Sequence, residues 1–332
     1  MKELGDWPVF GPDECWDASQ AALAAAGLSD GLPLVVPTTQ RLEAMLSGCS
    51  DPGRSHGLIA PLFGDLTNAA IAYNCVLAGC APGALPVVTT ALVACLDESF
   101  NLLGIATTTG SPAIATIVHG PVIARLGMNS DVNCLGPGNA VNAALGRAIA
   151  LALRNIAGVR TDGGDMATMG QPAKYGMCFP EGQARAFAPF HVRHGVPADE
   201  SAITVLGISG TAEVLPSHDT GNWDRPEDIL RPVALVMRTA LVAGGGARKT
   251  ERGEQVLLLP PELAELIAQR GWRLDDVQRY LFASEDAVGS GAIAGTPEDI
   301  HVIVTGGPGV KMTVLPLWGG GTQTVTRSLM TP

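Results

Sequence analysis

The chain has 332 residues, of which 46% are hydrophobic and 16% charged, and its formal net charge is −11. This length predicts a large core and about two domains, at roughly 150 residues for each domain. The acidic balance and the scattered lysines and arginines exclude the basic surface that nucleic-acid binding requires. The longest apolar run carries two arginines, which argues against a membrane span.

The N-terminus and the cysteines predict a cytoplasmic protein. The opening residues, MKELGDWPVFGPDE, are acidic and interrupted by proline, unlike a secretory signal. Seven cysteines in a chain without such a signal favour reduced thiols over a disulfide framework. We expect a small-molecule substrate and a homodimer, with the helices at 67–79 and 139–156 packing tightly and one of them joining the two copies.

Strand and helix patterns alternate along the chain, which favours an α/β or mixed α+β fold with small-residue-rich helices. Residues 31–48 read as a buried strand, a proline break and a helix. Residues 65–97 read as two helices, with Asp65 or Thr67 as the first N-cap and a break at Gly79 and Pro82. Further elements are expected at 105–121 (strands around a turn), 136–158 (helix, N-cap Asn139), 202–207 (strand), 227–243 (helix), 256–270 (strand, then helix), 274–282 (helix), 301–305 and 311–316 (strands).

The domain organisation follows from these patterns. We predict an N-terminal part at 1–160, an irregular site-forming segment at 161–200, and a C-terminal α/β part at 201–332, since long irregular segments are often functional. Two short echoes, 34–37 with 257–260 and 195–207 with 295–307, indicate a weak internal repeat. Ordinary α/β patterning explains them equally well.

Two cysteines, Cys75 and Cys80, flank the expected helix end. Five residues turn roughly 140° on an α-helix at about 100° per residue, so one regular helix cannot direct both thiols to one metal. Cys75 lies in an apolar stretch and is expected in the core. Cys80 precedes the next helix, whose N-terminus favours a thiolate, so it is a candidate nucleophile. An inert thiol in a tight helix junction is the alternative.

A glycine- and asparagine-rich segment precedes the helix at 136–158. Exposed backbone N–H groups and side-chain amides at a helix entry suit a carboxylate or a developing oxyanion. The alternative is a loop whose asparagines cap their own turns. The predicted substrate contacts here are Asn133, Cys134, Gly136, Gly138 and Asn139.

The stretch MGQPAKYGMCFPEG, at 169–182, concentrates polar side chains in an apparent loop. Lys174 would lower the pKa of Cys178 or bind a carboxylate, and Glu181 would act as acid or base. Gln171 and Tyr175 complete the predicted substrate contacts of this stretch. A solvated polar loop without a site is the alternative.

Histidines offer further candidates. His119 ends an apolar run and is a candidate acid, base or ligand, with a structural histidine as the alternative. His191 and His194 are three residues apart, but Pro189 and Pro197 bracket them, which disfavours a helical metal motif.

These residues favour an enzyme, a cysteine-dependent hydrolase or lyase. Cys80 or Cys178 would be the nucleophile and His119 or Glu181 its acid-base partner, acting at a C–N or C–S bond of a small carboxylate-bearing or electrophilic substrate. No cofactor is required. The alternatives are a metalloenzyme with Cys and His ligands around zinc or iron, and a non-catalytic subunit or thiol-exchange partner.

Three segments carry a resemblance to a known family: NCVLAGCAPGALPVV (74–88), MNSDVNCLGPGNAVNAALGRA (128–148) and GQPAKYGMCFPE (170–181). In these segments the chain resembles a bacterial family of similar length that accompanies small selenocysteine-Gly-Ser-Cys (UGSC-type) proteins. The resemblance covers most of 30–325 and implies a thiol-linked or redox enzyme system in the cytoplasm, with a redox partner protein. It implies no substrate and no role for any residue, and the selenocysteine-type motif itself is absent from this chain.

Overall fold

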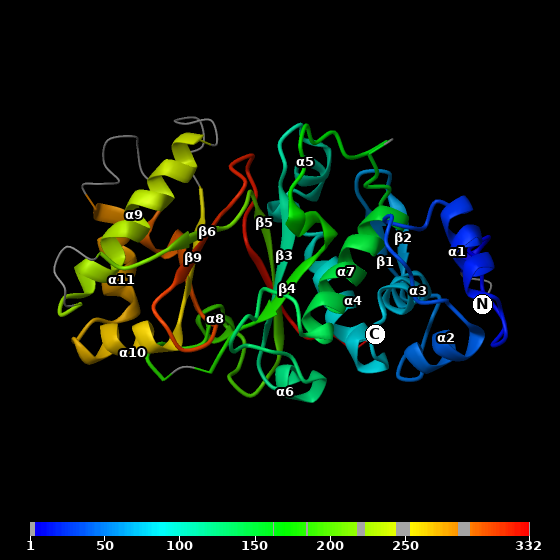
Figure 1. The fold of residues 1–332 in the computed structure, drawn as a ribbon, viewed down its shortest axis with the longest axis horizontal. Helices are drawn as coiled ribbons and strands as arrows, with labels where there is room; N and C mark the ends of the chain where they lie inside the picture. The colour runs from blue at the N-terminus through cyan, green and yellow to red at the C-terminus, as the bar shows by residue number, and fades with distance from the viewer. Residues whose placement is uncertain are drawn as a thin grey trace.

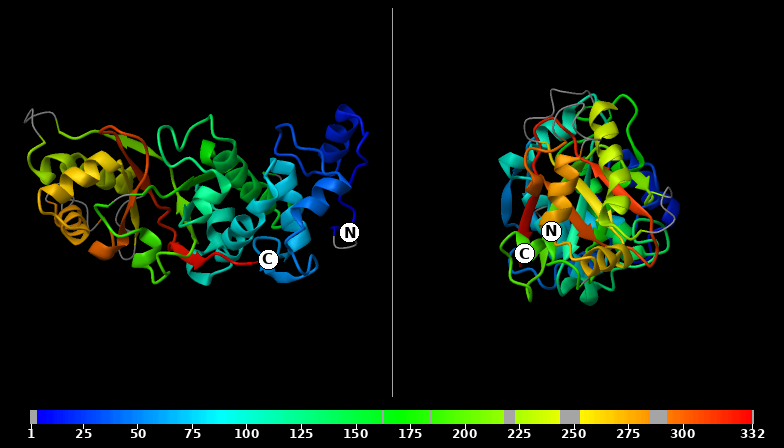
Figure 2. Two further views of the ribbon diagram at one scale, coloured as in Figure 1. Left: turned by 90° about the horizontal axis from the view of Figure 1, so that it is seen from below. Right: turned by 90° about the vertical axis from the view of Figure 1, so that its left-hand side faces the viewer.

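The computed structural model describes residues 4–161, 163–183, 185–217, 223–243, 253–284 and 293–331. Their fold is mixed α+β, as the sequence predicts. Two four-stranded sheets pack face to face, and helices cover the outer face of each sheet (Figure 1). The layers are stacked along the long axis of the molecule, and the end-on view is compact (Figure 2).

The first sheet has the order β10-β5-β3-β4, and the second has the order β6-β9-β7-β8. In each sheet the first two pairings are antiparallel and the third, β3 with β4 or β7 with β8, is parallel. The strands are β3 (Ala113–His119), β4 (Met177–Pro180), β5 (Ala202–Ile208), β6 (Ala212–Val214), β7 (Gln255–Leu259), β8 (Ile300–Val304), β9 (Met312–Pro316) and β10 (Val325–Ser328).

The two sheets repeat one pattern and exchange a strand. The run β3, β4, β5 builds the first sheet and then sends β6 to the second, while β7, β8, β9 build the second sheet and then send β10 back to the first. Strands from all three predicted parts of the chain therefore enter one sheet. The two sequence echoes do not coincide with this repeat, since 34–37 contains no strand and β5 and β8 occupy different places in their sheets.

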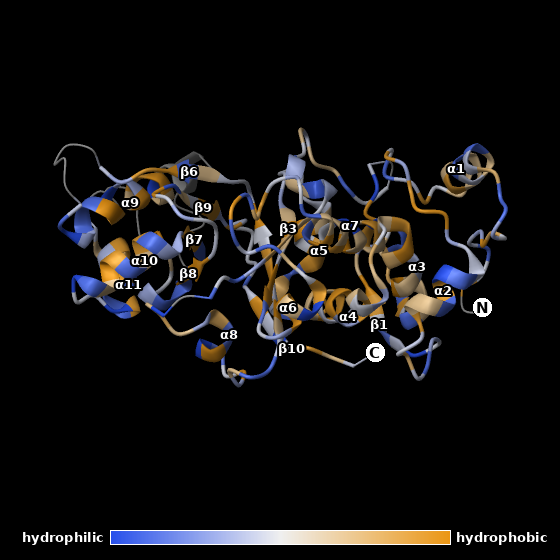
Figure 3. Ribbon diagram, turned by 60° about the horizontal axis from the view of Figure 1, so that its bottom comes forward, coloured by the Kyte–Doolittle hydropathy of each residue, from blue (hydrophilic) through white to orange (hydrophobic). Residues whose placement is uncertain are grey.

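Alternation along each strand builds separate cores on its two faces. On β3, Ala115 and Ile117 face the second sheet, whereas Val118 packs against helices. On β4, Phe179 faces the second sheet and Cys178 faces the helices. Figure 3 shows the same arrangement as hydrophobic colour along β3 and α3, with hydrophilic turns on the outer helices α2, α10 and α11.

Helices α4 and α7 cover the first sheet, α3 packs on the outer side of these two helices, and α9, α10 and α11 cover the second sheet. Every residue from Asn68 to Leu77 of α3 is buried within the chain, so α3 offers no surface for the expected homodimer.

The α-helices are α1 (Trp16–Ala25), α2 (Thr39–Met45), α3 (Asn68–Ala78), α4 (Leu85–Ala94), α5 (Leu102–Thr107), α6 (Val122–Leu126), α7 (Ala140–Asn155), α8 (Phe190–Arg193), α9 (Pro226–Ala243), α10 (Pro261–Gln269) and α11 (Leu274–Ala283). A small hairpin joins β1 (Ser55–Ile59) to β2 (Gly64–Thr67).

Local signals placed most helix ends correctly. The Thr67 hydroxyl accepts the Ala70 N–H, Gly79 closes α3 in the left-handed region with φ 82°, and Asn139 caps α7. Two strand expectations were wrong. Residues 33–37 form no strand, since Val35 donates to the carbonyl of Leu77 at the end of α3 rather than to a sheet. Residues 102–107 form α5, capped by the Asn101 side chain, so only the second half of 105–121 is a strand.

Among the described residues, no single helix has the length and hydropathy to cross a membrane, although the bent pair Pro82–Ala94 and Glu98–Thr107 meets those two criteria together.

A half-buried ion pair ties α7 to the segment before α2. Arg147 donates two hydrogen bonds of 2.9 Å to Asp30 and further bonds to the carbonyls of Leu32 and Pro33. Burial raises the pKa of Asp30, but the bonds from Arg147 and Leu32 outweigh burial, and the net pKa lies below its usual value.

We therefore expect Arg147→Met to lower the free energy of unfolding by about 2 kcal/mol at pH 7, the scale of hydrogen bonds to charged groups. A carboxylate with a depressed folded pKa stabilises the protein above its unfolded pKa, about 3.9, and loses that effect as the pH falls through the folded value. The difference between the parent and Arg147→Met should hold from pH 7 to 5 and shrink below pH 4 in urea unfolding. An equal difference at pH 3 would contradict the assignment.

Candidate functional site

A cavity of about 1200 Å³ opens where the two sheets meet. The residues that follow all four parallel strands line it: Gly120 after β3, Glu181 after β4, Pro261 after β7 and Gly306 after β8. Backbone bonds hold this corner, since Gly182 donates to the Val304 carbonyl at 2.7 Å. Ligands of open α/β sheets bind outside the carboxyl ends of parallel strands, so this cavity is the first candidate site.

His119, the last residue of β3, is fully buried on the strand face that looks toward the second sheet. Its Nε2 lies 2.8 Å from Thr204 Oγ1 on β5, and that hydroxyl lies 2.8 Å from Thr326 Oγ1 on β10. Its Nδ1 lies 2.7 Å from Glu181 Oε2. Hydroxyls of two neighbouring strands therefore fix the ring so that Nδ1 faces the carboxylate.

Glu181 follows β4 and is 8% exposed, with its side chain at the base of the cavity. Its backbone N–H continues the ladder by donating to the Val118 carbonyl. Its carboxylate accepts the Phe190 N–H at 2.9 Å on Oε1 and 3.1 Å on Oε2. The segment that starts α8 therefore holds this carboxylate in place.

His191, on α8, is the third member and also lines the cavity. It is 3% exposed, and neither of its ring nitrogens has a hydrogen-bond partner. Its Nδ1 lies 3.9 Å from Glu181 Oε2, which is beyond hydrogen-bond length. Buried polar groups are nearly always bonded, so an unbonded imidazole beside a carboxylate points to a missing partner.

The donor set fits a metal ion. One ligand atom from each of His119, Glu181 and His191 lies within 4.8 Å of the other two, and no other such trio occurs among the described residues. Two histidines and one glutamate are a set that holds catalytic zinc, with a fourth position left for water or substrate. A ligating histidine normally donates its other ring N–H to a fixed partner, and Thr204 is that partner for His119.

The charges of the trio suit ligation. Burial lowers the pKa of His119, which favours the neutral imidazole that binds metals. Burial also acts to raise the pKa of Glu181, but the imidazoles of His119 and His191 outweigh it and bring the pKa to about 2. The group therefore combines an ionised carboxylate with a neutral imidazole.

No protein-family model matches this sequence, and no curated protein is a significant match. The resemblance to the family that accompanies UGSC-type proteins therefore stays a prediction.

A second histidine–glutamate pair lies on the other side of Phe190. His301, on β8, has Nε2 at 3.3 Å from Glu254 Oε2, and Glu254 also accepts the Thr324 N–H at 2.7 Å. The Phe190 ring is stacked near His119 at a centroid distance of 5.7 Å and meets the His301 ring edge-on at 5.3 Å. His194 stacks on the same ring at 4.0 Å. Three of the six histidines thus contact one aromatic ring.

The predicted acid-base residues meet, but the predicted nucleophiles lie elsewhere. Cys178 is buried on the helix-facing side of β4, opposite to Glu181 and His119. Burial and the neighbouring Cys80 raise the pKa of Cys178, and Lys174 is paired with Asp165 instead. The expected activation of Cys178 by Lys174 is therefore wrong.

Cys75 and Cys80 lie on either side of the glycine that ends α3. After Gly79 the chain folds back, and the Cys80 N–H donates to the Cys75 carbonyl at 2.9 Å. Cys75 is fully buried, and burial together with the Cys80 thiol raises its pKa. Cys80 itself is half-buried and lies near Cys75 and Cys178. It lines neither the cavity at the trio nor the second cavity beside Lys174. Its role as a nucleophile stays a prediction.

The asparagine-rich loop borders the cavity without presenting its predicted residues to it. Ser130 and Asp131 line the cavity, whereas the five predicted contacts do not. The Asn133 amide donates to the Pro137 carbonyl, and Asn139 caps α7. Cys134 is buried with Sγ 3.7 Å from Thr305 Oγ1. The amides therefore hold the loop itself, which was the alternative reading, while Gly136 and Gly138 shape its turns.

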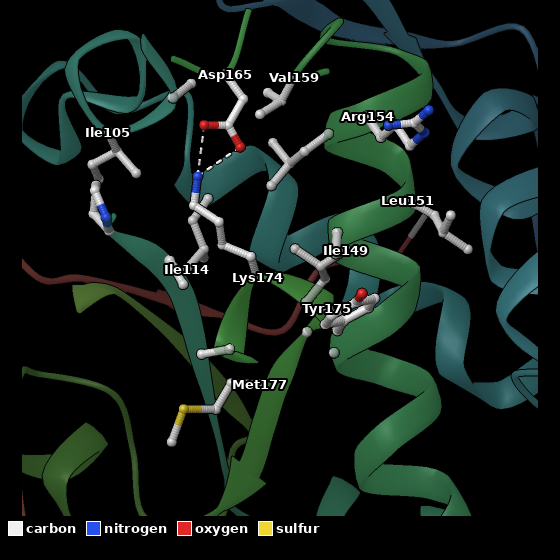
Figure 4. Close-up of a pocket in the computed structure, with 18 of the residues that line it drawn as sticks. Ile105, Ile114, Ile149, Leu151, Arg154, Val159, Asp165, Lys174, Tyr175 and Met177 are labelled. Carbon is white, nitrogen blue, oxygen red and sulfur yellow. Dashed lines mark hydrogen bonds and ion pairs between the residues drawn. The ribbon is translucent and has the colours of Figure 1, made fainter. Parts of the chain in front are cut away.

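Gln171, Lys174 and Tyr175 lie at the amino end of β4, so the strand separates them from Glu181 at its carboxyl end. Gln171 donates to the carbonyls of Ser111 and Ile208 and has a structural role. Lys174 and Tyr175 line a second cavity, shown in Figure 4.

Proposed function

We propose that the protein is a metal-dependent hydrolase that binds a divalent transition metal, zinc foremost, with His119, Glu181 and His191. The observation that carries the proposal is His191, a buried imidazole without any hydrogen bond, placed beside an ionised carboxylate at the base of a large cavity. With a metal bound, His119 and Glu181 would ligate it in place of their hydrogen bond to each other.

The residues around the trio suit hydrolysis. When bound, the metal would supply a Lewis acid able to take up water or substrate. Glu181 and His191 line the cavity and His119 lies behind them, so a substrate would approach from the side of Gly120 and Gly306. Asp131 and Glu262 are the other carboxylates at this cavity and are the candidates to move a proton.

The charged residues that line the cavity limit the class of substrate that it can bind. Its lining contains Asp131, Glu181 and Glu262 but no lysine or arginine among the described residues. This lining disfavours an anion and suits a neutral or positively charged molecule with an electrophilic carbonyl, such as a small amide. A carboxylate-bearing substrate, expected from the sequence, finds no lysine or arginine in this lining.

The proposal is tested by removing and restoring metal. Purified protein is stripped with a chelator and assayed on a panel of small amides, lactams and esters before and after zinc is added. We expect hydrolysis of at least one neutral or cationic substrate to disappear with the chelator and return with zinc. Hydrolysis that survives complete metal removal would overturn the proposal.

The same assay evaluates a second candidate, a thiol-dependent reaction at Cys80. Its support is the half-buried Cys80 thiol next to Cys75 and Cys178. In that case activity would survive the chelator, Cys80→Ser would abolish it, and Cys75→Ala would mainly lower stability.

Thr204 gives a test of the metal site that leaves every ligand in place. Thr204→Val removes the hydroxyl that orients His119 and keeps the shape of the side chain. Loss of such an outer partner typically costs about 10–100-fold in metal affinity, and we expect a loss in this range. Zinc affinity is measured by competition with a chromogenic chelator, and Thr107→Val, an exposed hydroxyl bonded only to its own helix, is the control. Equal affinities for parent and Thr204→Val would show that His119 is not a ligand.

A further inference from the structure

The end of α3 is closed by a complete Schellman motif, a pair of backbone bonds that turns the chain back over the last helical turn. The Gly79 N–H donates to the Val76 carbonyl at 2.9 Å, and the Cys80 N–H donates to the Cys75 carbonyl at 2.9 Å. Gly79 adopts the left-handed conformation that this motif needs, with φ 82°. The motif therefore folds Cys80 back against the turn of α3 that carries Cys75.

This turn brings the thiols of Cys75 and Cys80 together. The two residues joined by the longer of the backbone bonds of a Schellman motif commonly have their side chains in contact, usually as an apolar pair. Here both side chains are thiols. Burial raises the pKa of Cys75, and a hydrogen bond with the Cys80 thiol raises it further. On a regular helix the two side chains would point about 140° apart, so their contact depends on the end of the helix at Gly79.

The two thiols differ in their access to solvent. Cys75 is fully buried, whereas Cys80 is half-buried. The neighbours of Cys80 in the chain, Gly79 and Ala81, are small and exposed. A small molecule in solution therefore reaches the sulfur of Cys80 first, and it reaches Cys75 only through Cys80.

A third thiol, Cys178, is a poorer partner for Cys80. It is buried on the helix-facing side of β4. The charge of Cys80 raises the pKa of Cys178, but without the hydrogen bond that Cys80 makes to Cys75. The contact at the end of α3 thus selects Cys75.

We propose that Cys75 and Cys80 are a dithiol that a small-molecule disulfide reversibly converts to a disulfide. Cys80 releases its proton to solvent and attacks one sulfur of the oxidant, so that a mixed disulfide forms and one thiol leaves. Cys75 then loses its proton and attacks Cys80 Sγ, which forms the Cys75–Cys80 bond and expels the second thiol. Two protein thiols are oxidised to one disulfide, the oxidant is reduced to two thiols, and excess thiol reverses both steps.

Glutathione buffers of varied oxidised-to-reduced ratio test the proposal on the full-length protein. Samples are quenched with acid, free thiols are alkylated with N-ethylmaleimide, and chymotryptic peptides are analysed by mass spectrometry. Cleavage after Leu77 leaves Cys75 and Cys80 on separate peptides that only a disulfide joins. We expect the joined peptides to appear with oxidised glutathione and to vanish with excess reduced glutathione. Cys95, buried on α4, should stay a thiol throughout and is the internal control.

Repeating the titration in urea measures what the fold contributes. In the native protein the Schellman motif holds the two sulfur atoms together, which raises their effective concentration. We therefore expect the equilibrium constant for forming the Cys75–Cys80 disulfide to be at least about tenfold larger in the native protein than in the unfolded chain.

Variants identify the partner and the order of the two steps. Cys178→Ser should form the Cys75–Cys80 disulfide as the parent does. Cys75→Ala should accumulate glutathione on Cys80, because the second step lacks its thiol. Cys80→Ser should leave Cys75 unmodified in the native protein, because Cys75 is fully buried.

Three results would overturn the proposal: Cys80 joined to Cys178 in place of Cys75, a parent protein in which Cys80 stays a thiol or carries only glutathione, or equal equilibrium constants in the native and the unfolded chain. None of these results bears on zinc binding, so this proposal and the proposed hydrolase stand or fall separately.

Discussion

His191→Leu should abolish zinc retention and lower hydrolytic activity by about 100-fold or more, the upper range for damage to a metal site. The metal-free protein should keep its stability within about 1 kcal/mol, because His191 makes no hydrogen bond that leucine would lose. This combination is specific, since a histidine with a structural role would show the opposite result. Metal content by mass spectrometry, activity and urea unfolding of the stripped protein provide the three readouts.

The matched control is the neighbouring His194→Leu. His194 lies three residues further on and stacks on Phe190, but its Nδ1 is bonded to the Phe190 carbonyl at 2.8 Å. It should retain zinc and lose some stability. If His194→Leu lost zinc and His191→Leu kept it, the ligand assignment would be wrong.

Phe190→Ala should produce the largest loss of stability, about 3–5 kcal/mol, the usual cost of removing a buried phenylalanine. The ring is fully buried between the two sheets and contacts His119, His194 and His301. Its removal leaves a space lined by imidazoles, which water would enter. Urea unfolding measures the loss, and Phe63→Ala is the control because that ring is exposed.

Phe190→Leu tests the contribution of side-chain volume to stability while leaving in place the backbone N–H that positions Glu181. Leucine restores most of the volume, so this variant should recover much of the stability while the backbone N–H that holds Glu181 remains. A Phe190→Ala protein as stable as the parent would show that the two sheets do not depend on this contact.

Local signals in the sequence predicted the helices well because they act over a few residues. Thr67, Gly79 and Asn139 each satisfy or close a helix end through bonds to residues three or four positions away. The strand expected at 33–37 failed because its apolar pattern serves burial against α3 rather than a sheet. Hydrophobicity alone does not distinguish an irregular segment buried against a helix from a strand paired in a sheet.

The site was only half predictable. His119 was recognised from its position after an apolar run and Glu181 as part of a polar cluster, but His191 was set aside because prolines bracket it. Its role depends on α8 lying across the ends of β4 and β8, a contact between segments distant in the sequence. Strand alternation would have corrected one error, since Cys178 and Glu181 are an odd number of residues apart and face opposite sides.

The exchange of β6 and β10 between the two sheets could not be predicted from the sequence. β10 pairs with β5 although about 120 residues separate Thr204 from Thr326 in register, and no local pattern specifies such a pairing. That pairing nevertheless places Thr326 against Thr204 and so helps to orient His119. The geometry of the candidate site thus arises from the least predictable part of the fold.

His119, Glu181 and His191 together are proposed to hold one metal ion. The most direct test is the zinc content of the purified chain after dialysis against a weak chelator, measured beside Glu181→Gln and, as control, Glu254→Gln, which alters the other buried glutamate–histidine pair. We expect about one zinc per chain in the parent and in Glu254→Gln, and none in Glu181→Gln. A parent protein that neither retains zinc nor takes it up from solution would contradict the claim.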